Sequence, residues 1–326
     1  MRNLKKRWYM LLVLAALLVV SNIVFFIMGT YFPSVLNKGD TTLPSQSAET
    51  QNRQVAIKEH IKDVSLHSPY AIVIDLEDRS TIYEKKIDER IYPASITKVM
   101  SAVVALDHIA DLSQTVTVEE QDLAGLAEAN ASVAGFQAGD TPTYEELLYA
   151  LILPSGADAA NILGNHLFGS VDAYVDAMNE KAESLGMNAT HFKNPIGLHE
   201  DDHYTTLADL TNMMNHAWIN TAFQGIMTTT SYEIKSSGFK IKSTLLVYGD
   251  DLSFAGGEII GGKSGYTLEA QCCLVSVAKM EDGHLYMIIS AKAGGDPSED
   301  HFHMNDAKTM YELIASTSYI KPESSK

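Results

Sequence analysis

The sequence predicts an α+β fold in which one antiparallel sheet is flanked by helices and joined to an all-helical subdomain. Two hairpin patterns predict the sheet, one at residues 70–85 and one at 272–291, near opposite ends of the folded part. Between them, apolar residues recur at helical spacing, as in 171–185 and 207–217. Strands from distant segments with helices between them are typical of one mixed domain. A third observation, a long apolar segment near the N-terminus, adds a predicted transmembrane helix.

The N-terminal segment is predicted to be an uncleaved signal anchor. Residues 10–28 are almost wholly apolar, and with the aromatic residues that follow they predict a span over 10–32. Roughly 20 helical residues cover the ~30 Å of bilayer hydrocarbon. Residues 1–9 contain four basic side chains and no acidic one, so we expect them to stay in the cytoplasm. A cleaved signal peptide would have a shorter apolar region and a small-x-small cleavage site. The expected location is therefore the cell membrane, crossed once, with the folded domain outside the cytoplasm.

The rest of the chain divides into a linker, one folded domain and a short tail. Residues 37–54 are rich in Ser, Thr, Gln and Asn and bury too little apolar surface to fold, so we expect a flexible linker over 33–58. The folded domain is predicted at 59–318, followed by a polar tail at 319–326. Its predicted strands are bounded by polar turns and are 71–74, 81–83, 272–278 and 285–291. The last pair is joined through Asp282-Gly283, a favoured tight turn, and a helix over 307–314 closes the domain.

Composition limits the classes of partner. The chain carries 24 basic and 41 acidic residues, a formal net charge of −17. Four of the basic residues lie before the predicted span, so the remaining chain is still more acidic and repels phosphate polyanions. A nucleic-acid partner is not expected. With 46% apolar and 20% charged residues, the chain also has ample apolar surface to fold.

The candidate catalytic group lies at the start of a buried helix. Residues 99–106 are apolar on every face, which predicts a helix without a solvent-exposed side. Ser95 and Lys98 precede it at i, i+3 spacing and share a face. A serine needs an adjacent base to act as a nucleophile. Lysine is a base only when neutral, so its pKa must fall by about three units, or ~4 kcal/mol, through burial or nearby positive charge.

Two further segments add polar groups of the same kind. A helical pattern over 144–151 is followed by a loop that carries Ser155. Residues 261–267 place Lys263 and Ser264 between glycines, which allow a substrate to approach the backbone closely.

In this order and spacing, the three segments resemble the Ser-x-x-Lys, Ser-x-Asn and Lys-Thr/Ser-Gly motifs of the penicillin-recognising serine enzymes. The hexapeptide at 93–98, Pro-Ala-Ser-Ile-Thr-Lys, is similar to that of the low-molecular-mass penicillin-binding proteins, the serine-type D-alanyl-D-alanine carboxypeptidases. The Asn-Pro-Ile-Gly-Leu segment at 194–198 supports the same family. The resemblance extends over about 70–314 and implies a β-lactamase/DD-peptidase-like fold.

The resemblance implies an activity and a role for each residue. Ser95 would attack the carbonyl between the two terminal D-alanines of a peptidoglycan stem peptide and form an acyl-enzyme, which water hydrolyses; β-lactams would act as inhibitors by trapping the same serine. Lys98 would accept the serine proton, and Ser155 would relay a proton to the leaving amine. No cofactor or metal is implied. The implied substrate-binding residues are Lys263, which also keeps Lys98 neutral, with Ser264, Gly265, Tyr266 and Thr267. Backbone N–H groups of Ser95 and Tyr266 would form the oxyanion hole.

The sequence departs from the family pattern at three positions. Ala157 stands where the family usually has Asn, and Ser264 replaces the commoner Thr but keeps the hydroxyl. His303 stands where the family often has an Arg that binds the substrate's terminal carboxylate. An imidazole can do this only when protonated, so we expect affinity for the carboxylate to weaken as pH rises through the pKa of His303.

Three alternative functions share some of these features. A β-lactamase would use the same nucleophile, but class A enzymes deacylate with a Glu beyond the second motif and residues 190–194 contain none. A non-catalytic binder or sensor could use the same fold. Finally, His199 and His203 match the His-Glu-x-x-His pattern of zinc metallopeptidases, with Glu200 as base. The surrounding sequence is polar and predicts a loop rather than the helix that such a site needs.

Overall fold

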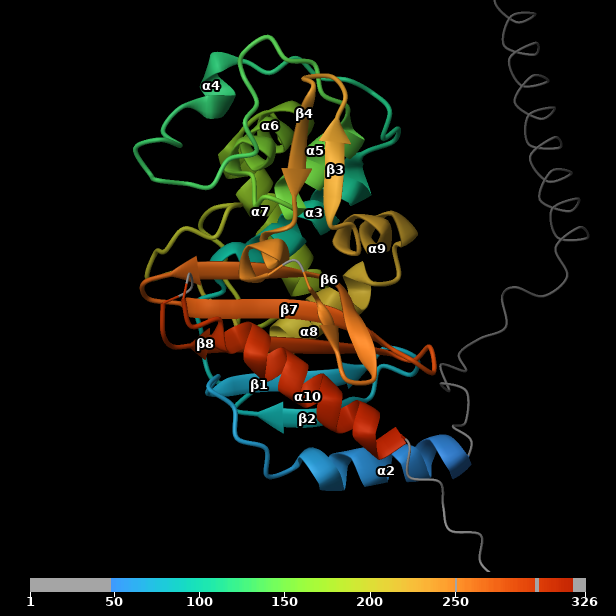
Figure 1. Cartoon of the computed structure of the whole chain (residues 1–326). Coiled ribbons are helices and arrows are strands. Elements are labelled where there is room, and N and C mark those ends of the chain that lie inside the picture. Colours follow the sequence, from blue (N-terminus) through green and yellow to red (C-terminus); the bar gives the residue numbers. More distant parts are fainter. Residues whose placement is uncertain (1–47, 250, 297–298, 319–326) are drawn as a thin grey trace, which may run out of the picture. The chain divides into compact units, whose positions relative to one another are not determined.

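A six-stranded antiparallel sheet forms the centre of the protein, which is described here by a computed structural model covering residues 48–249, 251–296 and 299–318 (Figure 1). Its strand order is β2-β1-β8-β7-β6-β5, so the first hairpin pairs with the last strand of the chain. The strands of this sheet are β1 (Tyr70–Asp75), β2 (Thr81–Lys85), β5 (Ser253–Phe254), β6 (Gly257–Thr267), β7 (Gln271–Met280) and β8 (Leu285–Ala293). A separate hairpin consists of β3 (Ser231–Ile234) and β4 (Phe239–Lys242).

Helices cover both faces of the sheet. The helices are α2 (Ala48–Ile61), α3 (Thr97–His108), α4 (Glu120–Leu123), α5 (Tyr144–Ile152), α6 (Ala157–Phe168), α7 (Val171–Ser184), α8 (Leu207–Ala217), α9 (Thr221–Met227) and α10 (Phe302–Ser318), with 3-10 turns η1 (Ala94–Ile96) and η2 (Thr244–Tyr248). Strand β1 shows how the faces are divided. Ala71 and Val73 pack with α2 and α10, whereas Ile72 and Ile74 belong to the core shared with α3 and α8, because alternate side chains of a strand point to opposite faces.

Helix α3 is the centre of the helical part. Every residue from Thr97 to Ala105 is buried. The helix packs against α5, α6, α7 and α8. Helices α5, α6 and α7 gather with the β3–β4 hairpin beyond one edge of the sheet, whereas α8 lies behind the sheet and contacts β1 and β8 (Figure 1). The prediction of a helix without an exposed face is confirmed, so the residues at its N-terminus are held by the core itself.

The predicted hairpins and helices are present, and two segments differ. Residues 261–267, considered in the sequence only as a glycine-rich motif, belong to the long strand β6. The predicted linker over 33–58 is wrong in its last part, because α2 begins at Ala48. Ile57 and Ile61 lie one turn apart on α2 and are fully buried with α10 residues, which gives this polar segment an apolar edge.

Three predicted segments lie outside the described residues: the tail 1–9, the span 10–32 and the C-terminal tail 319–326. Within the described ranges, no helix combines the length and apolar composition needed to cross a bilayer.

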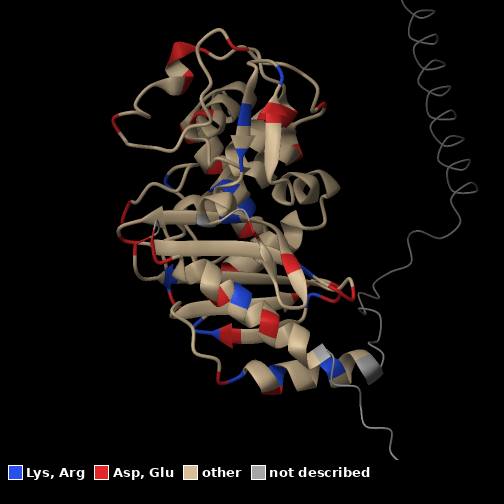
Figure 2. Cartoon of the chain, viewed as in Figure 1, with Lys and Arg blue, Asp and Glu red and all other residues tan. Residues whose placement is uncertain are grey.

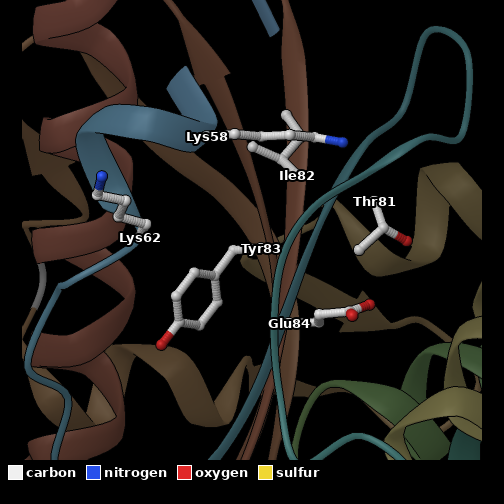
Figure 3. A pocket seen from close by; sticks show the side chains of 6 residues that line it. All are labelled: Lys58, Lys62, Thr81, Ile82, Tyr83 and Glu84. Atoms are coloured by element: carbon white, nitrogen blue, oxygen red, sulfur yellow. The ribbon is translucent and has the colours of Figure 1, made fainter. Parts of the chain in front are cut away.

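Neither the distribution of surface charge nor the pocket beside α2 marks the predicted site. Acidic residues are spread over peripheral loops and on α4, whose first turn carries the exposed Glu120 (Figure 2). A pocket of about 450 Å³ opens between α2 and the edge strand β2 (Figure 3), and its lining residues are Lys58, Lys62, Thr81, Ile82, Tyr83 and Glu84. None of the three predicted motifs contributes to it. The candidate site is therefore located by its side-chain chemistry.

Candidate active site

Ser95 and Lys98 lie together at the start of α3. Ser95 is in the 3-10 turn η1 and is partly exposed, while Lys98, in the first turn of α3, is 2% exposed. The Nζ atom of Lys98 lies 3.2 Å from Oγ of Ser95, within hydrogen-bond distance. The turn thus presents a hydroxyl to solvent and a buried amine behind it, which is the arrangement that a serine nucleophile with a lysine base requires.

The surroundings of Lys98 favour its neutral form. Burial lowers the pKa of Lys98 to about 7, against the opposing effect of the Asp158 carboxylate, which raises it. The amine also donates to the carbonyl oxygen of Ile196 at 2.7 Å, which fixes its direction. A pKa near 7 leaves a substantial fraction of free base at neutral pH, so Lys98 can accept a proton from Ser95.

Lys263, on β6, is a second buried amine. It is fully buried, and its Nζ donates to the carbonyl oxygen of Ser264 at 2.7 Å. Burial lowers the pKa of Lys263 well below its usual value, and a charge on Lys98 lowers it further. Because two ammonium groups in one buried region repel each other, a charge on either lysine favours the neutral form of the other.

Strand β6 touches the turn that carries the serine. A Cβ atom placed on Gly265 would lie 2.6 Å from the backbone nitrogen of Ser95 and 3.1 Å from Cβ of Ala94. Only glycine allows this approach. The contact brings the N–H of Ser95 close to the end of β6, where Tyr266 and Thr267 follow. Tyr266 is 41% exposed. Oγ1 of Thr267 accepts from the N–H of Ala270 at 3.1 Å.

The segment 194–198 supports the serine turn from another side. A Cβ atom on Gly197, whose φ is +82°, would overlap the carbonyl of Ala94, so only glycine fits there. Oδ1 of Asn194 accepts from the N–H groups of Gly197 at 2.8 Å and Leu198 at 3.1 Å, which shapes the loop. Oγ of Ser101, one turn after Lys98, donates to the carbonyl oxygen of Pro195 at 2.6 Å. The loop and the first two turns of α3 therefore form one unit.

Ser155 has an unusual backbone and a free hydroxyl. It lies between α5 and α6 with φ of +65°, a conformation that a non-glycine residue adopts only when its surroundings impose it. Its side chain is 4% exposed, and Oγ has no hydrogen-bond partner among the described residues. Because a buried hydroxyl without a partner is costly, this strained and unsatisfied group is typical of a functional position.

Asp158, which the sequence analysis did not single out, secures the loop beside Ser155. Its buried carboxylate accepts from the backbone N–H groups of Ala134 at 2.8 Å, Gly135 at 2.8 Å and Phe136 at 3.1 Å. Ala157, which stands at the family's Asn position, is fully buried, and its N–H donates to a carbonyl of the same loop, that of Ser132, at 2.7 Å. The second motif thus fixes the loop 132–136 through its backbone and one carboxylate.

Ser264 has a partner that no sequence motif indicated. Its Oγ donates to Oγ1 of Thr244, the first residue of η2, at 2.9 Å. The N–H of Thr244 donates to the carbonyl oxygen of Leu153 at 2.9 Å, two residues before Ser155. Thr244 therefore joins the second and third motifs.

His303 lies at the start of α10 and is fully buried. Burial lowers the pKa of His303 to about 4; His301 adds to this effect and Asp306 opposes it. The imidazole is therefore neutral at neutral pH. One turn later, the carboxylate of Asp306 accepts from the backbone N–H groups of His67 at 2.9 Å and Ser68 at 2.7 Å. Binding of a carboxylate by His303 stays a prediction, and the protonation that it needs occurs at acidic pH.

The zinc alternative requires two histidines on one helix face, and the structure places them in a loop. Residues 199–203 are not helical. Nε2 of His203 lies 2.8 Å from Oγ1 of Thr97, and Nδ1 accepts from the N–H of Lys193 at 3.1 Å, so both ring nitrogens already have protein partners. Among the described residues, no group of three or more His, Cys, Asp or Glu side chains is arranged to hold a metal ion. His203 instead connects Thr97, at the start of α3, with Lys193 through hydrogen bonds.

Comparison with known proteins agrees with this geometry. The family model of the D-alanyl-D-alanine carboxypeptidases matches residues 55–292. The chain is 30% identical over 237 residues to D-alanyl-D-alanine carboxypeptidase DacF of Bacillus subtilis, which covers 70% of this chain and 58% of that protein. It is 34% identical over 209 residues to D-alanyl-D-alanine carboxypeptidase DacB2 of Mycobacterium tuberculosis, which covers 64% of this chain and 69% of the relative.

The fold is also found in solved structures. The crystal structure of a Streptomyces DD-transpeptidase superposes with a TM-score of 0.68 at 27% identity, over 78% of this chain and 98% of the other. The expected DD-peptidase-like α+β fold is thereby confirmed. Because the family model extends from before β1 to the end of β8 and so includes all three motifs, the chain belongs to the D-alanyl-D-alanine carboxypeptidase family.

Proposed function

We propose that the protein is a serine DD-carboxypeptidase that removes the terminal D-alanine from peptidoglycan stem peptides and binds penicillin covalently. One observation carries the assignment of roles: the amine of Lys98, buried and with its pKa lowered to about 7, lies 3.2 Å from Oγ of Ser95. Family membership supports the same reaction.

The reaction has two covalent steps. Oγ of Ser95 attacks the carbonyl carbon between the two D-alanines while Lys98 accepts its proton. The N–H groups of Ser95 and Tyr266 stabilise the oxyanion, an interaction of ~3 to 4 kcal/mol per donor. The C–N bond then breaks, and the leaving amine receives the proton from Lys98 through the hydroxyl of Ser155. In the second step, Lys98 takes a proton from water, which attacks the ester carbonyl. The bond between this carbon and Oγ of Ser95 then breaks, Lys98 returns the proton to Oγ, and the shortened peptide is released.

The free hydroxyl of Ser155 supports its role as the relay. It is buried and has no hydrogen-bond partner among the described residues, so it is available to bond to both Lys98 and the leaving amine when the substrate is bound. Its main-chain conformation is fixed between two helices, which limits the motion of Oγ.

We also propose that the protein is anchored in the cell membrane by residues 10–32, with its N-terminus in the cytoplasm and the catalytic domain outside. The support is the apolar composition of this segment and the basic residues before it. A membrane location would keep the enzyme next to its polymeric substrate. Alkaline extraction of membranes tests the anchor: the full chain should stay in the pellet, and a chain that begins at residue 46 should be soluble.

Labelling with a fluorescent penicillin tests the catalytic assignment. The wild type should form a stable covalent adduct, Ser95→Ala should form none, and Ser113→Ala, which changes an exposed serine, should label as the wild type does. Release of D-alanine from a peptide ending in D-Ala-D-Ala should follow the same order. Rapid loss of the label would indicate a β-lactamase, and labelling without peptide hydrolysis would indicate a binder. Loss of peptide hydrolysis on treatment with EDTA would favour the metallopeptidase.

A further inference from the structure

A pair of hydroxyl groups lies beside the buried lysine of β6. Ser264 is buried, whereas Thr244 is partly exposed, and their oxygen atoms are 2.9 Å apart. A ligand can therefore reach the pair from the Thr244 side. Sequence motifs account for Ser264 but not for Thr244, which lies 20 residues earlier in the chain.

The main chain, rather than packing of the side chain, places the Thr244 hydroxyl. The N–H of Thr244 donates to the carbonyl of Leu153 at 2.9 Å, and the N–H of the preceding Ser243 donates to the carbonyl of Thr230 at 2.8 Å. Ser243 also begins η2, since its side chain accepts from the N–H of Leu245 at 3.3 Å. The residue is thus fixed on both sides, and a change of its side chain should leave the backbone in place.

The proposed substrate ends in a free carboxylate, and burial lowers the pKa of both Lys263 and His303, which weakens the positive charge available to attract it. The amine of Lys263 already donates to the carbonyl of Ser264. His303 is neutral at neutral pH. The protein as a whole has a net charge of −17, so long-range attraction is absent. Recognition of the carboxylate then depends on short-range hydrogen-bond donors, and hydrogen bonds to a charged acceptor are stronger than those between neutral groups.

We infer that Thr244 is a positioning residue that, with Ser264, determines specificity for a free terminal carboxylate. In the structure the Ser264 hydroxyl donates to Oγ1 of Thr244. When the carboxylate binds, Ser264 turns its proton to a carboxylate oxygen, and Thr244 donates its own proton to Oγ of Ser264. Thr244 thereby holds Ser264 in the orientation that donates to the substrate. This inference rests on the proposed function.

A pair of substrates and three variants test the inference. The substrates are two peptides that end in D-Ala-D-Ala, one with a free carboxylate and one with a terminal amide. The variants are Thr244→Val, which removes the hydroxyl but keeps the shape, Thr244→Ser, which restores it, and Thr211→Val. The last is a matched control, because the Thr211 hydroxyl on α8 donates only to the carbonyl of Leu207, within its own helix.

Thr244→Val should raise KM for the free-carboxylate peptide about fivefold, the factor expected for the loss of one hydrogen bond between two hydroxyl groups, with a smaller change in kcat. KM for the amide peptide should change little. The ratio of the two KM values, which measures the preference for a free carboxylate, should therefore move toward one. Thr244→Ser should recover the preference, and Thr211→Val should keep it. Equal effects on the two peptides, or no effect, would overturn the inference.

Penicillin labelling separates this inference from the proposed function. If the wild type labels at Ser95 and hydrolyses the free-carboxylate peptide but Thr244→Val leaves the preference unchanged, the inference on Thr244 fails and the enzyme assignment remains. If the wild type neither labels nor hydrolyses either peptide, both fail together.

Discussion

Gly265 lies against Ser95 so closely that a single methyl group on the glycine would reach 2.6 Å from the serine nitrogen. Strand β6 and the turn η1 lie far apart in the sequence, with most of the helices between them, yet their main chains touch at the candidate nucleophile. This contact sets the distance between the two N–H groups proposed for the oxyanion hole, and it makes glycine necessary at this position.

Gly265→Ala should therefore abolish function without unfolding the protein. The added methyl forces β6 away from η1, which separates the oxyanion donors, so the rate of acylation by penicillin should fall at least about a hundredfold. Gly225→Ala is the matched control, because a Cβ there meets no atom within 4 Å. Stopped-flow acylation measures the rate, and circular dichroism checks the fold. Acylation of Gly265→Ala at the wild-type rate would show that the close contact is not needed.

The pH dependence of kcat/KM should report the ionisation of Lys98. The free base is required, and burial lowers the pKa of Lys98 to about 7, so kcat/KM should rise as pH increases through about 7 and level off above it. Below that point the rate should fall about tenfold per pH unit. Initial rates between about pH 5 and about pH 9 measure this limb. A profile that is flat across this range would exclude Lys98 as the base.

Asp158→Asn should shift the rise of kcat/KM with pH to lower pH and should remove hydrogen bonds that hold the loop 132–136. The carboxylate of Asp158 raises the pKa of Lys98, so its removal should lower that pKa further. An amide can also accept fewer of the hydrogen bonds from Ala134, Gly135 and Phe136, which should cost about 1 to 3 kcal/mol of stability. The pH–rate profile and urea unfolding measure the two effects. A limb that moves to higher pH would contradict this account.

His203 should make the fold less stable in weak acid. Burial lowers the pKa of His203 from 6.5 to about 4, so between these values the unfolded chain binds a proton that the folded protein does not. The contribution of neutral His203 to the free energy of unfolding is complete above pH 6.5. It is lost as pH falls toward 4, at up to about 1.4 kcal/mol per pH unit.

The variant His203→Gln isolates this effect. Glutamine can donate to Thr97 and accept from Lys193 as the imidazole does, but it does not titrate. The free energy of unfolding, measured with urea between about pH 4.5 and about pH 7, should therefore depend less steeply on pH in the variant. Carboxylates titrate in both proteins and cancel in the comparison. Identical slopes would show that His203 is not the group responsible.

Much of the fold could be predicted because its signals are local. The apolar run of β1 and the apolar faces of α3 indicate from neighbouring residues alone that both elements are buried. Helix α2 was not predicted because its composition is polar. Its two fully buried apolar residues, Ile57 and Ile61, pack with residues of α10, which is far away in the sequence. Two apolar residues on one face of a polar helix do not predict burial unless the helix that packs against them is known.

The candidate site divides in the same way. The sequence by itself indicated the candidate nucleophile, the candidate base and the glycines, since Ser95 and Lys98 meet within one helical turn and the motifs are short. Only the tertiary structure decided the rest. The lowered pKa of Lys98, the neutral state of His303 and the link from Thr244 to Ser264 all depend on contacts between distant segments. Burial and hydrogen bonding are properties of the assembled core, and no local pattern of residues encodes them.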